Sequence, residues 1–92
     1  MKINWTKKSI DCLQQIKDYI SLDNEANAVK FIEKIFAIAE SLNKNPERGR
    51  VVPEFSKPNI REIIYKNYRI VYLYEKNSIS ILTIFEGHKK LK

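Results

Sequence analysis

The chain has 92 residues, a hydrophobic fraction of 43% and a net charge of +6, which predict one folded domain over residues 1–92 and exclude a disordered chain or two independent cores. Cys12 is the single cysteine, so an internal disulfide is excluded, and the apolar runs are too short for a membrane span or an export leader. These features predict a cytoplasmic protein with no membrane partner.

The first half of the chain has the pattern of a short strand followed by two helices. Residues 2–5 alternate polar and apolar side chains, and Thr6 follows them as a candidate helix N-cap. Apolar residues then recur at helical spacing up to about Leu22, and again from Glu25 to Leu42. Because only two or three residues join these stripes, they predict an antiparallel helical hairpin.

Both helical stripes are expected to be buried. The first contains Ile10 with Tyr19 beside it, and the second is widened by Val29, Phe36 and Ile38. A stripe this wide predicts contact with both the other helix and a sheet. A hydrophobic core is therefore preferred over a cofactor or membrane face.

The second half of the chain has the pattern of a sheet. Residues 50–55 predict an extended edge segment, because Pro53 cannot donate a ladder hydrogen bond. Residues 60–66, 68–75 and 78–85 are rich in Ile, Val and Tyr and predict an antiparallel meander of three strands. The expected fold class is α+β, with a short N-terminal strand and an antiparallel helical hairpin packed on a twisted antiparallel sheet.

Positive charge is concentrated after residue 45, where ten Lys and Arg accompany five Asp and Glu. This half is expected to bind an anionic target. The sequence has no metal-ligand pattern and no glycine-rich phosphate loop, so no metal or cofactor is expected. The candidate anion-binding side chains are Arg48, Arg50, Arg61, Arg69, Lys89 and Lys90.

Arg61 and Arg69 lie inside predicted strands, and the turn between the strands decides whether they act together. A two-residue turn places their side chains on opposite faces of the sheet, whereas a three-residue turn places them on one face. For Arg69, phosphate binding and ion pairing with a glutamate carry equal weight. For Arg61, which is followed directly by Glu62, a structural ion pair is favoured.

The series GRVVPE, IRE and NYRIVY within residues 49–72, with DYI at residues 18–20, resembles the RelE/ParE superfamily of bacterial type II toxins. The resemblance covers essentially the whole chain and implies the fold predicted above. It also implies a cognate antitoxin protein that wraps and neutralises the toxin, with operator DNA bound only through that antitoxin. The pattern is more similar to the ParE branch, which implies growth arrest by poisoning of DNA gyrase.

One nuclease subgroup of the superfamily, that of YoeB, implies a different mechanism. Glu54, Arg69 and His88 match its glutamate, arginine and histidine, with implied roles of general base, phosphate clamp and general acid. The reaction would be metal-independent cleavage of mRNA on the ribosome. Lys89 stands where that subgroup has a tyrosine, so this mechanism ranks second.

A third alternative is an inactive, toxin-derived scaffold that binds only an antitoxin. Under either active mechanism, Arg69→Ala is expected to weaken toxicity and to leave the fold intact.

Overall fold

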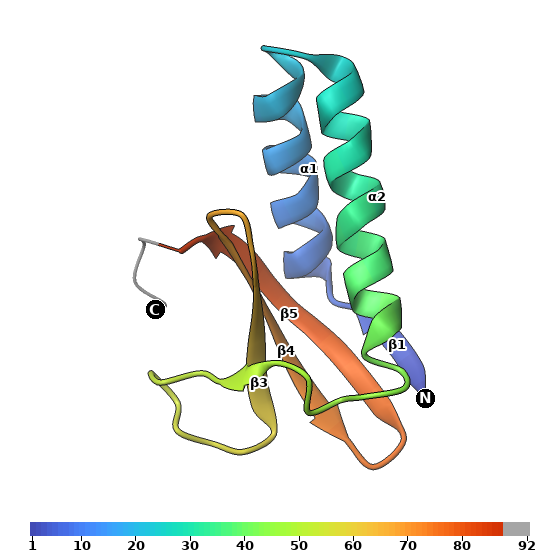
Figure 1. Cartoon of the computed structure of the whole chain (residues 1–92), viewed down its shortest axis with the longest axis vertical. Coiled ribbons are helices and arrows are strands. Elements are labelled where there is room, and N and C mark those ends of the chain that lie inside the picture. Colours follow the sequence, from blue (N-terminus) through green and yellow to red (C-terminus); the bar gives the residue numbers. More distant parts are fainter. Residues whose placement is uncertain (88–92) are drawn as a thin grey trace.

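The computed structural model describes residues 1–87 of the chain, and the predictions for His88, Lys89 and Lys90 lie outside the described residues. A short strand and two helices precede a run of four strands (Figure 1). The elements are β1 (Lys2–Trp5), α1 (Lys7–Ser21), α2 (Glu25–Ser41), β2 (Arg50–Val51), β3 (Ile60–Tyr65), β4 (Tyr68–Glu75) and β5 (Ser78–Glu86).

The sheet has the strand order β1-β5-β4-β3-β2, in which β1 pairs in parallel with β5 and all other pairs are antiparallel. The predicted α+β class and the meander of β3, β4 and β5 are therefore confirmed. The expected edge segment over residues 50–55 is wrong in length, because β2 ends at Val51. Pro53 follows within a turn closed by a hydrogen bond from Phe55 N–H to the Val52 carbonyl, 3.2 Å long.

Each helix begins at a side-chain cap that the sequence provides. Thr6 Oγ1 accepts a hydrogen bond from Ser9 N–H at 3.1 Å, as predicted, and also donates to the Ile81 carbonyl at 2.7 Å. Asn24 caps α2 by accepting from Asn27 N–H at 3.0 Å. The Thr6 hydroxyl thus starts α1 and attaches that start to β5.

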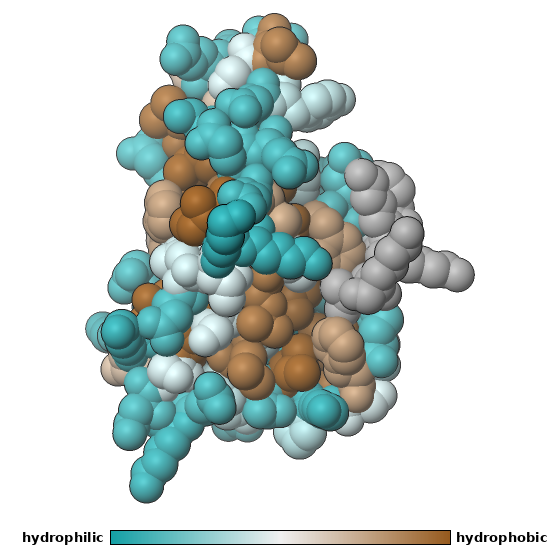
Figure 2. Space-filling view, turned by 180° about the vertical axis from the view of Figure 1, so that it is seen from behind, coloured by the Kyte–Doolittle hydropathy of each residue, from teal (hydrophilic) through white to brown (hydrophobic). Residues whose placement is uncertain are grey.

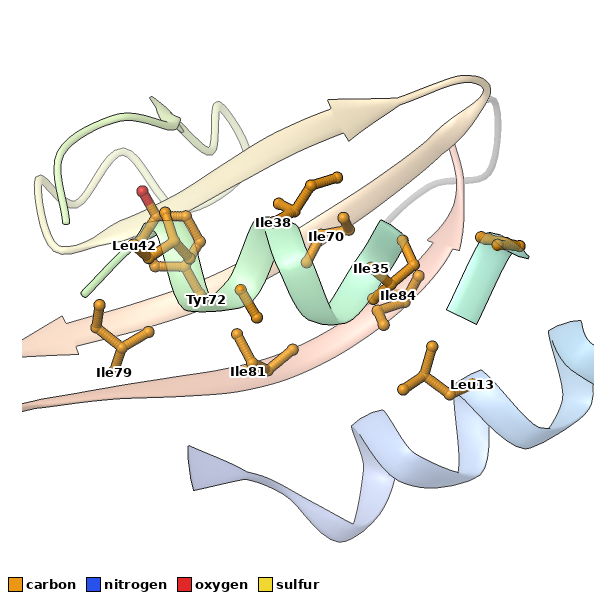
Figure 3. Packing of buried hydrophobic residues seen from close by; sticks show 11 residues of the cluster. Leu13, Ile35, Ile38, Leu42, Ile70, Tyr72, Ile79, Ile81 and Ile84 are labelled. Carbon is orange, nitrogen blue, oxygen red and sulfur yellow. The ribbon is translucent and has the colours of Figure 1, made fainter. Parts of the chain in front are cut away.

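The main core lies between α2, α1 and one face of the sheet (Figure 3). The buried side chains come from both helices, from the residue that ends α2, and from the sheet. They are Leu13, Phe31, Ile35, Ile38, Ala39, Leu42, Ile70, Tyr72, Ile79, Ile81 and Ile84.

The far end of the helical hairpin, where α1 ends and α2 begins, extends well beyond the strands of the described chain (Figure 1). Ile38 is buried as predicted, but Ile10, Val29 and Phe36 are between 42% and 47% exposed and Tyr19 is 70% exposed. The expectation that these four side chains are buried is therefore wrong. From behind, hydrophobic surface appears between hydrophilic residues over both the helical hairpin and the sheet (Figure 2).

The loop between α2 and β2 is fixed to the sheet by one tyrosine. Tyr72 on β4 is fully buried, and its hydroxyl accepts from Gly49 N–H at 2.9 Å and donates to the Pro46 carbonyl at 2.6 Å. A Cβ added at Gly49 would lie 2.5 Å from the Glu62 carbonyl oxygen. Only glycine allows this approach, which brings β2 against β3.

Neither helix of the described chain has the length and apolar character that crossing a bilayer requires. Residues 1–87 also contain no group of three or more His, Cys, Asp or Glu side chains arranged to hold a metal ion.

Candidate functional site

Four charged side chains from separate segments meet on the side of the sheet opposite the main core. Arg69 Nε donates to Glu62 Oε1 at 2.6 Å, and its two terminal nitrogens donate to the two oxygens of Glu54 at 2.8 and 2.9 Å. Arg50 Nε donates to the other oxygen of Glu62 at 2.6 Å. We call these four residues the arginine–glutamate network.

Strand register explains why these side chains meet. The turn between β3 and β4 has two residues, because Tyr65 pairs with Tyr68, and this register aligns Ile64 with Arg69. Since side chains alternate along a strand, Arg69 points away from the core-facing neighbours on β4, and Glu62 on β3 points the same way. Pairing of Arg50 with Glu62 adds the β2 side chain.

The same register separates the two strand arginines. Arg61 pairs with Tyr72, a core residue, so it lies on the opposite face from Arg69. Of the two turn alternatives, the two-residue turn is the one present. The β-hairpin of β3 and β4 therefore does not bring Arg61 and Arg69 into one composite anion site.

The network buries its charges and satisfies them internally. Arg69 is 6% exposed and the Glu62 side chain is 0% exposed, while the Glu54 side chain is 35% exposed. The hydrogen bonds to Glu54, with a smaller contribution from Glu62, raise the pKa of Arg69 above its ordinary value, although burial acts in the opposite direction. The ring of Phe85 lies 5.0 Å from the Arg69 guanidinium carbon.

This geometry bears directly on the predicted roles of Arg69 and Glu54. The structure brings them together, but as partners of each other rather than as groups open to a target. Of the two roles that the sequence left open for Arg69, phosphate clamp and ion pair, the structure contains the ion pair. Against the expectation that Arg69→Ala leaves the fold intact, this geometry predicts a loss of stability, because the buried Glu62 carboxylate would lose one of its two arginine partners.

The other predicted arginines differ in exposure. Arg61 donates to the carbonyls of Pro58 and Gly49 at 2.8 and 2.9 Å, so its role is structural, as favoured from the sequence. Arg48 is exposed and bonds Ser41, and the Arg50 side chain is 62% exposed.

A second feature is a groove between the hairpin and the end of the sheet, which the sequence analysis did not find. It consists of two adjoining hollows of about 270 and 350 Å³ that share Tyr68, and we call it the Tyr68 groove. Phe31 packs against Tyr68 with ring centroids 5.0 Å apart. Burial, together with the nearby Glu86 carboxylate, raises the pKa of Tyr68.

Charge along the Tyr68 groove is uneven. Lys30 and Lys66 border the larger hollow, and Glu86 borders the smaller one. Cys12 also lines the smaller hollow, where its half-buried Sγ lies 3.6 Å from Thr83 Oγ1. The sequence signal for this groove is the group of tyrosines in residues 65–74, but nothing in the sequence connects them to the helices.

Comparison with known proteins adds a family and a fold match. Residues 3–91 match the family model described as the ParE toxin of the type II toxin-antitoxin system parDE. No curated protein matches the chain in sequence. Among solved structures, a chain of the chromosomal ParDE toxin-antitoxin system from P. aeruginosa superposes with a TM-score of 0.75 at 24% identity, over 94% of this chain and 95% of that one.

Proposed function

The chain belongs to the ParE toxin family of type II toxin-antitoxin systems, and from this premise we propose that it arrests growth in the bacterial cytoplasm by binding and poisoning DNA gyrase. A cognate antitoxin protein neutralises it. The protein acts by binding a macromolecule, without a metal or cofactor of its own.

One observation favours binding over RNA cleavage. A nuclease of this design needs an arginine open to a phosphate and a carboxylate able to accept a proton. Here Arg69 is 6% exposed, and Glu54 binds it through both oxygens. In the chain without a bound partner, the two residues that cleavage would need are therefore engaged with each other.

The surface that meets the target is proposed to be the exposed basic rim around β2. Arg48, Arg50 and Lys57 are exposed there, and they belong to the half of the chain that carries most of the net positive charge. Such a surface attracts an anionic target over about a Debye length, roughly 8 Å at physiological salt.

The Tyr68 groove is proposed to receive the antitoxin. Its floor is aromatic, with Phe31 against Tyr65 and Tyr68, and Lys30 and Lys66 border it. These features suit a segment that inserts apolar side chains and places carboxylates beside the lysines. Lys66→Glu is expected to weaken the complex about tenfold, while Lys76→Glu, at the other hairpin turn, is the matched control.

Controlled expression in a bacterium tests the target. Gyrase poisoning predicts filamentation and DNA damage with intact mRNA, and loss of supercoiling activity when the purified protein is added to gyrase. Rapid loss of translation with mRNA cut on the ribosome would replace this proposal by the nuclease mechanism. If expression causes no growth defect, the remaining alternative is an inactive, toxin-derived scaffold that binds only an antitoxin. The double variant Arg48→Ala/Lys57→Ala should weaken toxicity, whereas Lys7→Ala on α1 should not.

A further inference from the structure

The guanidinium of Arg69 is arranged to bind an anion, and a glutamate of the same chain fills that position. Its Nε donates to Glu62 on β3 at 2.6 Å, and Phe85 on β5 lies under the guanidinium. The two terminal nitrogens donate to Glu54, which belongs to the loop between β2 and β3. The sheet thus orients the guanidinium, and a loop residue fills its outer edge.

The two carboxylates that bind Arg69, those of Glu62 and Glu54, differ in how deeply they are buried. The Glu62 side chain is fully buried and is also bound by Arg50, whereas the Glu54 side chain is 35% exposed. Residues 53–58 are all exposed, and Ser56 has a φ of 51°, a left-handed conformation that is costly for a residue with a side chain. Glu54 is therefore the carboxylate that an incoming anion can replace.

We propose that Arg69 is an anion-binding residue masked in cis by Glu54, and that an oxyanion of a bound partner takes the place of Glu54. The outer edge of the guanidinium forms two parallel hydrogen bonds, which suit the paired oxygens of a carboxylate or a phosphodiester. The charges of Arg50, Arg69, Glu54 and Glu62 cancel, so displacement of Glu54 leaves one positive charge for the incoming anion.

Masking by Glu54 also explains how Arg69 can be buried and neutralised in the free chain and still take part in anion binding by this positively charged half. A permanently open guanidinium would bind any anion, whereas a masked one requires a partner that also holds the loop aside. Anion binding by Arg69 therefore depends on contacts that the partner makes with other parts of the chain.

Nuclear magnetic resonance of the full chain, labelled with ¹⁵N-arginine, tests the mask. The Arg69 Nε–Hε signal is followed during titration with dimethyl phosphate, and separately with acetate, at constant ionic strength. Glu54→Ala should bind at least one of these anions at a concentration about tenfold lower than the unchanged chain requires. Whichever of the two titrations saturates shows whether the partner supplies a phosphodiester or a carboxylate.

Glu47→Ala is the matched control, because it removes the same charge from a glutamate that lies 3.6 Å from Arg61. It should leave the Arg69 response unchanged. The proposal is overturned if Glu54→Ala binds neither anion more tightly, or if Glu47→Ala enhances binding equally, since net charge would then explain the effect. If Glu54→Ala does not fold, Glu54→Gln, which keeps the side-chain size, decides by the same comparison.

Discussion

Replacement of Arg69 by alanine tests whether the arginine–glutamate network stabilises the fold. The change removes the partner that binds Glu62 Oε1, and the Glu62 side chain is 0% exposed. Breaking a buried ion pair by removing one partner typically costs about 3–5 kcal/mol. We expect the lower end, about 3 kcal/mol, because Arg50 still binds Glu62 and Glu54 is partly solvated.

This loss is large for a chain of this size. A domain of 92 residues has a total unfolding free energy of about 5–14 kcal/mol. The melting temperature should fall by roughly 12–24 °C, at about 4–8 °C for each kcal/mol. Urea denaturation followed by Trp5 fluorescence and circular dichroism measures the free energy directly, and it separates lost toxicity from lost folding.

Arg50→Ala is the matched control, because it removes an arginine from the same Glu62 at a position 62% exposed, and it should cost no more than about 1 kcal/mol. The double change Arg69→Ala/Glu62→Ala should recover part of the loss, because no buried carboxylate remains. The reasoning is refuted if Arg69→Ala costs less than about 1 kcal/mol, or no more than Arg50→Ala.

Three further changes test other parts of the fold by thermal unfolding. Gly49→Ala should cost about 3 kcal/mol or prevent folding, because its Cβ would meet the Glu62 carbonyl at 2.5 Å; a near-normal melting temperature would contradict this. Tyr72→Phe should cost about 1–3 kcal/mol by leaving Gly49 N–H and the Pro46 carbonyl without their partner, and an unchanged stability would argue that water replaces the hydroxyl. Lys66→Gly should stabilise by up to about 1 kcal/mol, since Lys66 has a φ of 55°; a lower melting temperature would show that the Lys66 side chain matters more than the turn.

Much of the fold could be predicted because its elements repeat local patterns. The helical stripes, the Thr6 cap and the three long strands all follow from spacing and residue type. The predictions failed where a local pattern extends beyond its tertiary support. Tyr19 has the right periodicity but lies near the tip of the helical hairpin, whereas Ile10 and Phe36 line a hollow between the two helices, where Phe36 contacts Trp5.

The candidate site was predicted only in its composition. The sequence pointed to Arg48, Arg50, Arg61 and Arg69 as candidates, and pairing of Arg69 with a glutamate was one of two options. The complete burial of the Glu62 side chain was not predicted, because a glutamate within a strand is usually solvated. The Tyr68 groove was missed because its walls come from helices and strands far apart in sequence.

The sequence by itself determined the elements, the surplus of positive charge and the toxin family, since each depends on residue type and short-range order. Only the tertiary structure decided which arginines reach solvent. A strand reverses the direction of every side chain when its register moves by one residue, so the two-residue turn before Tyr68 fixes Arg69 on one face and Arg61 on the other. Packing of distant segments then places Glu54 and Glu62 against Arg69 and neutralises it.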